Sequence, residues 1–260
     1  MLLDLAGRVV VITGAGRGIG RVIAERFLRE GSVVVGVDIE IGPLEWLSAA
    51  EPERAAAFAC DVRDGARANA VVTDVLERFG RIDVLVNNAG VFVEGLVEEL
   101  DDERWDFCFD VNVGGTFRMC RAVIPAMKAQ QSGRIINAAS FAAIVPSVGS
   151  AAYAASKSAV VQFTRTLAGE LGPWNITANA YAPGMIPTAM NNFADLTGAA
   201  RDRLLDTLAL RRWGEAAEVA DLVCFLASDA ARYITGTLVD VSGGKLATQL
   251  PRHLYKTAGQ

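Results

Sequence analysis

The sequence contains very little histidine: His253 is the only one among its 260 residues. No G-x-S-x-G motif is present either, so a serine hydrolase with a histidine base is excluded. The cysteines are scattered, with no C-x-x-C pair and no neighbouring histidine, which predicts no metal site and buried thiols rather than disulfides. These cysteines are Cys60, Cys108, Cys120 and Cys224.

Long hydrophobic runs and an excess of basic residues are also lacking. No apolar run approaches the ~18 residues of a membrane span, and no basic-then-apolar leader opens the sequence. The net charge of −5 gives no basic surface for nucleic acid. We therefore expect a cytoplasmic protein with neither membrane nor nucleic-acid partners.

Hydrophobic residues are abundant, at 52%, against 21% charged residues, which suits a well-buried core. Apolar β-branched runs alternate with helical patterns, and no linker, low-complexity tract or repeat separates them. Such alternation predicts parallel strands joined by right-handed crossovers. We predict one α/β domain over residues 1–260, a Rossmann-type doubly wound parallel sheet of about seven strands with helices on both faces.

The expected strands are short apolar runs, and the expected helices carry apolar residues at helical spacing. Strands are expected at 8–13, 33–38, 55–59, 83–87, 134–138, 176–181 and 238–241, and helices at 18–30, 64–79, 102–129, 152–171 and 216–226. The helical pattern 102–129 is interrupted around Gly114–Gly115. The least regular region, Pro187–Leu210, is expected to be a mobile loop over a site.

A glycine-rich loop, TGAGRGIG at Thr13–Gly20, leaves the first expected strand and opens the first expected helix. In this context Gly14 permits a tight turn, Gly18 lets backbone approach a pyrophosphate, and Gly20 allows close packing. The helix N-terminus adds N–H donors and a positive dipole. A purely structural glycine turn is the alternative interpretation.

Asp38 ends the second expected strand, 18 residues after Gly20. A carboxylate there accepts hydrogen bonds from the ribose hydroxyls of NAD and repels the 2′-phosphate of NADP. Arg17 would attract that phosphate, but Asp38 holds the more decisive position. We predict that NAD is the cofactor and that NADP is disfavoured.

The stretch Ser140–Lys157 ends in Tyr-x-x-x-Lys, with Ser140 thirteen positions before Tyr153. On a helix, Tyr153 and Lys157 share one face, with side chains about 5–6 Å apart. An ammonium at that distance favours the phenolate and lowers the tyrosine pKa. The pair therefore predicts a general base that works near neutral pH without histidine.

Together these motifs resemble the short-chain dehydrogenase/reductase family, in its single-domain branch, from about Leu5 to Gly244. The resemblance also rests on Asp61, on NNAG at Asn87–Gly90, on Asn112, on Pro183–Gly184 and on Ser242–Gly244. It implies a catalytic tetrad made by Asn112, Ser140, Tyr153 and Lys157. Since all four positions are filled, we expect an active enzyme rather than a non-catalytic NAD-binding sensor.

The resemblance implies a role for each tetrad member. Tyr153 takes the hydroxyl proton while hydride passes to the nicotinamide, and Ser140 holds the substrate oxygen. Lys157 lowers the tyrosine pKa and binds the nicotinamide ribose, and Asn112 positions a relaying water.

The resemblance also implies the cofactor contacts. Asp61 and Val62 meet the adenine; Asn87, Ala89 and Gly90 line the middle of the cofactor; Thr188, beside the Ile186 backbone, holds the carboxamide. The full implied set is Gly14, Arg17, Gly18, Ile19, Gly20, Asp38, Asp61, Val62, Asn88, Ala89, Gly90, Tyr153, Lys157, Pro183, Gly184, Ile186 and Thr188.

The substrate is less well defined by the sequence. The expected pocket is mostly apolar and is built from Phe92, Ser140, Ala142, Val148, Tyr153, Met185, Met190, Asn191 and Phe193. We favour an NAD-dependent oxidoreductase of a small secondary alcohol or ketone, such as a polyol or sugar. The alternative is a 3-oxoacyl-thioester reductase that uses NADPH and docks an acidic carrier protein on basic residues. Gln131 and Trp174 stand where a basic side chain would be expected.

The resemblance implies a homotetramer or homodimer, because family members mostly assemble this way. The alternative is that the long apolar helix faces are buried within one subunit. The C-terminal tail 245–260 extends past the last expected strand, and we expect it either to reach a neighbouring subunit or to fray.

Overall fold

A computed structural model describes residues 3–191, 193–245 and 247. Its centre is a seven-stranded sheet in the order β3-β2-β1-β4-β5-β6-β7, in which every neighbouring pair is parallel. The strands are β1 Val9–Thr13, β2 Val33–Asp38, β3 Ala55–Ala59, β4 Val84–Asn87, β5 Gly133–Ala138, β6 Ile176–Pro183 and β7 Leu238–Val241. The predicted doubly wound parallel sheet is confirmed.

The central strands are apolar on both faces because helices cover both. All five residues of β1 are buried, and so are all four of β4. The chain order along the sheet reverses between β1 and β4, which pair directly from Val10 with Val84 to Ile12 with Val86. In such sheets a crevice opens at this point, outside the carboxyl ends of the strands.

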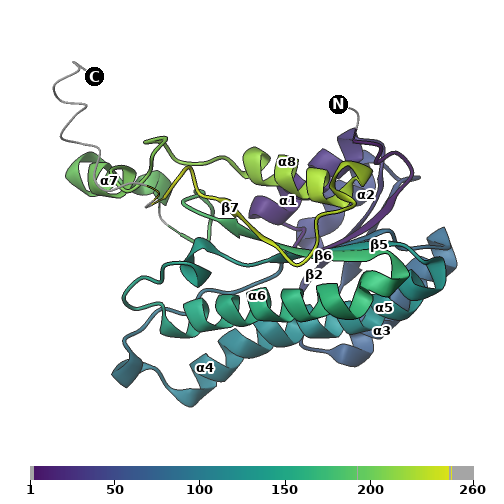
Figure 1. The fold of residues 1–260 in the computed structure, drawn as a ribbon, viewed down its shortest axis with the longest axis horizontal. Helices are drawn as coiled ribbons and strands as arrows, with labels where there is room; N and C mark the ends of the chain where they lie inside the picture. Colours follow the sequence, from purple (N-terminus) through teal and green to yellow (C-terminus); the bar gives the residue numbers. More distant parts are fainter. Residues whose placement is uncertain (1–2, 192, 246, 248–260) are drawn as a thin grey trace.

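Helices form a layer on each face of the sheet (Figure 1). One layer holds α1 (Gly18–Arg29), α2 (Glu45–Ala50) and α8 (Ala216–Ala227), and the other holds α3 (Gly65–Phe79), α4 (Asp102–Phe109), α5 (Thr116–Gln130) and α6 (Ala151–Leu171). Two apolar clusters of buried side chains fill the spaces between these layers and the sheet. Burial at about 25 cal/mol per Å² makes these clusters the main stabilising contribution.

The expected helix interruption near Gly114–Gly115 is a π-helical turn, Asp110–Gly115, between α4 and α5. Gly115 faces Val62, whose Cγ2 would lie 2.5 Å from an added Cβ. A larger residue would therefore push this turn away from the loop after β3. The turn buries Asn112 completely.

Two helices were not predicted. The region expected to be an irregular loop contains α7, Gly198–Leu205, and the short α2 follows β2. Neither has a strong apolar stripe, so their sequences gave no helical signal. Backbone N–H of Gly214 donates to the Met185 carbonyl at 3.1 Å, which closes the base of this region.

Within the described ranges, no helix is long and apolar enough to cross a bilayer. Most of the tail expected at 245–260 lies outside the described residues, which there include only Lys245 and Ala247.

Candidate active site

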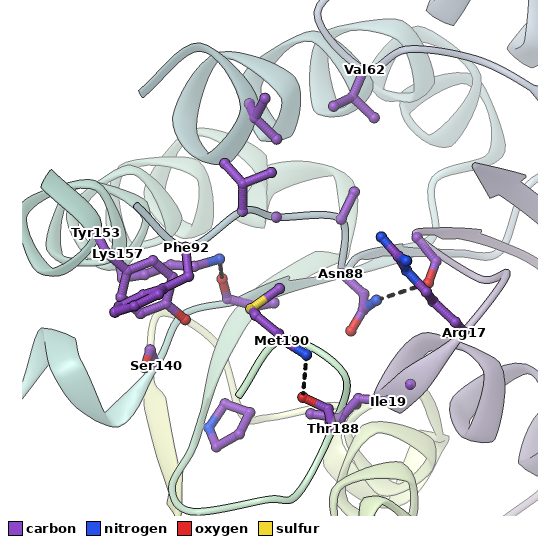
Figure 2. Close-up of a pocket in the computed structure, with 18 of the residues that line it drawn as sticks. Arg17, Ile19, Val62, Asn88, Phe92, Ser140, Tyr153, Lys157, Thr188 and Met190 are labelled. Carbon is purple, nitrogen blue, oxygen red and sulfur yellow. Dashed lines mark hydrogen bonds between the residues drawn. The ribbon is translucent and has the colours of Figure 1, made fainter. Parts of the chain in front are cut away.

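A cavity of about 580 Å³ opens at the carboxyl ends of the central strands. Its walls come from the glycine-rich loop after β1, the ends of β2 and β3, the segment after β4, the end of β5, helix α6 and the segment after β6. Motifs that lie far apart in the sequence therefore share one space. Figure 2 shows Ser140, Tyr153 and Lys157 on one side of it and Arg17 and Val62 on the other.

The glycine-rich loop has a conformation that side chains would obstruct. Gly14 and Gly18 have φ angles of +66° and +57°, in the left-handed region that favours glycine. A Cβ on Gly16 would come within 2.6 Å of the Pro43 Cβ, and one on Gly20 would collide with the Gly14 carbonyl. Backbone therefore lines the cavity directly at the N-terminus of α1, an arrangement that fits a pyrophosphate.

Asp38 is hydrogen-bonded to the glycine-rich loop. Its Oδ2 accepts a hydrogen bond from the Gly16 N–H at 2.9 Å, and its Oδ1 accepts one from the Ile39 N–H at 2.9 Å. Because Asp38 also lines the cavity, its negative charge is fixed beside the loop. Arg17 lines the same cavity and is exposed.

Asn88 braces the glycine-rich loop. Its Nδ2 donates to the carbonyls of Thr13 and Gly14, both at 3.2 Å, while its Oδ1 accepts from the Tyr181 hydroxyl at 3.0 Å. Sequence reasoning missed Tyr181, a fully buried ring on β6 that also lines the cavity. The neighbouring Asn87 is buried, donates to Asn137 at 2.9 Å and does not line the cavity. The expectation that Asn87 lines the middle of the cofactor stays a prediction.

Lys157 is buried on α6, one turn after Tyr153. Its Nζ donates to the Ala138 carbonyl at 2.8 Å and lies 5.8 Å from the centroid of the Tyr153 ring. The Tyr153 ring also meets the ring of Phe92, which lines the cavity. Figure 2 shows Ser140 next to the Tyr153 hydroxyl. Helical spacing and strand order thus bring the three predicted side chains together.

The electrostatics differ from the expectation of a lowered tyrosine pKa. Burial raises the pKa of Tyr153 above its ordinary value, and the hydrogen bond with Ser140 only partly opposes this. Burial also lowers the pKa of Lys157 to about 8, because removal from water disfavours the ammonium. The two side chains therefore lie in surroundings that favour their neutral forms, and proximity alone does not make Tyr153 a strong base.

Asn112 does not line the cavity. Its Oδ1 accepts from the Val91 N–H at 2.8 Å, and its Nδ2 donates to the Val91 carbonyl at 3.0 Å and to Ser156 Oγ at 2.9 Å. The side chain therefore fixes the backbone that follows Gly90. Its expected role in positioning a water stays a prediction.

Of the full cofactor set that the resemblance implies, every residue except Gly20 lines the cavity. The substrate set is less well matched. Ser140, Tyr153, Met190, Phe92 and Asn191 line the cavity, whereas Ala142, Val148, Met185 and Phe193 do not. Met185 is only 6% exposed, and Val148 is 93% exposed and lies outside the cavity. The walls also include Arg63 and Phe107, which sequence reasoning missed.

Comparison with known proteins agrees with this geometry. A family model described as enoyl-(acyl carrier protein) reductase matches residues 14–245. The 3-oxoacyl-[acyl-carrier-protein] reductase FabG of Thermotoga maritima is 40% identical over 245 residues, covering 93% of this chain and 99% of the relative. The short-chain reductase protein NovJ of Streptomyces niveus is 42% identical over 245 residues, covering 91% and 93%.

A similar solved structure is that of a putative short-chain alcohol dehydrogenase from Sinorhizobium meliloti. It aligns with a TM-score of 0.90 and 35% identity, and covers 95% of this chain and 100% of that one. Fold, site and comparisons define an oxidoreductase that acts on alcohol or keto groups. The chain belongs to the short-chain dehydrogenase/reductase family.

Proposed function

We propose that this enzyme interconverts a ketone and a secondary alcohol with a nicotinamide dinucleotide, and that a 3-oxoacyl thioester is its first candidate substrate. The observation that carries the reaction type is the single cavity shared by the glycine-rich loop and by Ser140, Tyr153 and Lys157. The substrate class follows the printed names of several relatives at 35–40% identity. Our expectation of a polyol or sugar substrate has less support from these relatives.

The residues present fit a dinucleotide. Gly14 and Gly18 would hold the pyrophosphate, and Thr188 and the Ile186 backbone would hold the nicotinamide end. Met190 N–H donates to Thr188 Oγ1 at 3.3 Å, so this end of the cavity is bordered by a turn (Figure 2). When bound, the nicotinamide supplies or accepts the hydride.

The protein supplies the proton and holds the reacting oxygen. Ser140 Oγ would donate to the ketone oxygen, and the Tyr153 hydroxyl would give that oxygen its proton. A raised tyrosine pKa suits this direction, because the acid form dominates at neutral pH. Lys157, held by the Ala138 carbonyl, would stabilise the resulting phenolate by its positive charge.

We propose NAD(H) as the preferred dinucleotide on the basis of Asp38. Its carboxylate lies within hydrogen-bond distance of Gly16, beside the loop that would hold the pyrophosphate. A 2′-phosphate close to this carboxylate would meet a like charge. Arg17, one of the cationic side chains that line the cavity, would oppose this effect.

A small free alcohol is the second candidate, and it is favoured by the charge near the cavity. Residues 94–106 carry seven acidic residues and one arginine, and they begin two positions after Phe92. An acidic carrier protein or another anionic carrier would be repelled there. This charge favours an uncharged substrate over one that is attached to an acidic carrier.

The proposal is tested with cofactor titrations followed by a substrate panel. Fluorescence titration with NADH and NADPH should give tighter NADH binding. The panel would compare a 3-oxoacyl N-acetylcysteamine thioester, the same acyl group on acyl carrier protein, and polyols or sugars with NAD. Tyr153→Phe is the control for catalysis at this site. Binding of neither dinucleotide, or turnover that survives Tyr153→Phe, would contradict the proposal.

A further inference from the structure

We infer that Arg63 and Phe107 are a positioning pair for the adenosine half of the dinucleotide, and that Arg63 acts by orienting the Asp61 carboxylate. This inference rests on the proposed use of a nicotinamide dinucleotide. All three residues line the same cavity, together with Val62.

Arg63 holds Asp61 in one orientation. Its Nε lies 2.9 Å and its Nη2 lies 2.7 Å from Asp61 Oδ2, and its backbone N–H donates to Oδ1 at 2.9 Å. The guanidinium holds the pKa of Asp61 below its ordinary value, so the carboxylate keeps its charge at neutral pH despite its partial burial. A fork of this kind fixes the plane of a carboxylate, which a lysine cannot do.

The ring of Phe107 contacts the guanidinium of Arg63. The Arg63 Cζ lies 5.2 Å from the centroid of the Phe107 ring, within the range of a cation–π contact. Arg63 belongs to the turn after β3, while Phe107 belongs to α4. The stack therefore joins two segments that are 44 positions apart in the sequence and closes this side of the cavity.

This arrangement of Asp61, Arg63 and Phe107 contributes little to the stability of the fold. The Arg63 and Asp61 side chains are 39% and 30% exposed, and exposed ion pairs contribute about 0–1 kcal/mol. Phe107 is 40% exposed, so much of its apolar surface faces water. A planar, partly apolar base would cover that surface, and the 6-amino group of adenine would match the ionised Asp61 as a donor.

The test measures binding rather than turnover. NADH, reduced nicotinamide mononucleotide (which lacks the adenosine half) and reduced nicotinamide hypoxanthine dinucleotide (which replaces the 6-amino group by an oxygen) are titrated by fluorescence. The variants are Arg63→Gln, Arg63→Lys and Phe107→Ala. Arg67→Gln is the matched control, because Arg67 is a nearby, partly exposed arginine that donates to the Ala59 carbonyl and does not line the cavity.

We expect Arg63→Gln and Phe107→Ala to weaken NADH binding about five- to tenfold, and to leave the mononucleotide within about twofold of wild type. Arg63→Lys should behave like Arg63→Gln, because the fork is lost. The preference of the wild type for NADH over the hypoxanthine analogue should shrink in Arg63→Gln. Arg67→Gln should match wild type for all three ligands.

If the wild type binds NADH but Arg63→Gln shows no selective loss of NADH affinity, this inference is overturned and the proposed function stands. Equal losses for NADH and the mononucleotide would also overturn it, because they indicate a general structural effect. A wild type that binds no dinucleotide would overturn the proposed function together with this inference. Thermal melting of each variant checks that it is folded.

Discussion

The ring of Phe92 meets the ring of Tyr153 edge-on, with centroids 5.1 Å apart and planes inclined by 74°. Phe92 is 42% exposed and lines the cavity. It comes from the segment after β4, which Asn112 fixes through two hydrogen bonds to Val91. A rigidly held aromatic side chain therefore limits the space next to the proposed proton donor.

Replacement of Phe92 by alanine should change which ketones the enzyme accepts. The smaller side chain opens room beside Tyr153, so kcat/KM for a substrate with a bulky group next to the carbonyl should rise about tenfold. The value for a small ketone should fall severalfold, because apolar contact is lost. Phe92→Leu is the matched variant, and its kcat/KM for each ketone should lie between the values of the wild type and of Phe92→Ala. Equal effects on large and small ketones in steady-state assays would contradict a role in selectivity.

Replacement of Asp38 by asparagine should reduce the discrimination between NADH and NADPH. The variant removes the negative charge but keeps an oxygen that can accept from Gly16. We expect the ratio of the two dissociation constants to fall by at least about tenfold, mainly through tighter NADPH binding. Glu40→Gln is the control, since this nearby acid is exposed and does not line the cavity. An unchanged ratio in fluorescence titrations would assign the selection to other residues.

Local patterns in the sequence predicted much of this site. The glycine spacing at 13–20 and the helical spacing of Tyr153 and Lys157 each involve residues only a few positions apart, so both can be recognised in the sequence without a structure. Tyr181 and Asn88 are 93 positions apart, and Arg63 meets Phe107 only because α4 packs near the turn after β3. No local period encodes such contacts. The prediction of a lowered pKa for Tyr153 was wrong for the same reason, because this pKa depends on burial that only the folded chain creates.

Gly20→Ala should destabilise the protein strongly. An added Cβ would collide with the Gly14 carbonyl and the Asn88 amide, which together hold the glycine-rich loop. We expect a loss of about 2–4 kcal/mol in the free energy of unfolding, measured by denaturant titration. Gly42→Ala is the matched control, because a Cβ there meets nothing within 4 Å, and it should change stability by less than about 1 kcal/mol. Similar losses in both variants would contradict this packing role.

The two directions of the reaction should depend differently on pH. Burial raises the pKa of Tyr153, so the phenol predominates throughout the neutral range and the phenolate fraction increases with pH. Ketone reduction requires the phenol, and its kcat/KM should be nearly flat from pH 6 to 8. Alcohol oxidation requires the phenolate, and its kcat/KM should rise about tenfold per pH unit. Tyr153→Phe should lower both by about a thousandfold or more. A flat oxidation profile up to pH 9 would count against this role.

Lys157 should make the stability of the free enzyme depend on pH at alkaline values. Its pKa is about 8 in the folded protein and 10.5 for an ordinary lysine. Between these values the unfolded chain binds more protons than the folded one, so stability rises as the pH rises from about 8 to about 10.5. Below this window both states carry the proton, and the folded state bears the full cost of burying the ammonium.

Lys157→Met isolates this contribution, because the other titrating groups are unchanged. We expect the wild type to gain on the order of 3 kcal/mol relative to this variant across the window. Lys128→Met, at a lysine outside the cavity, should follow the wild-type curve. Urea unfolding at half-unit steps of pH would measure all three proteins. Parallel wild-type and Lys157→Met curves would show that Lys157 keeps an ordinary pKa, and the phenolate would then have a neighbour that stays mostly charged until the pH approaches 10.5.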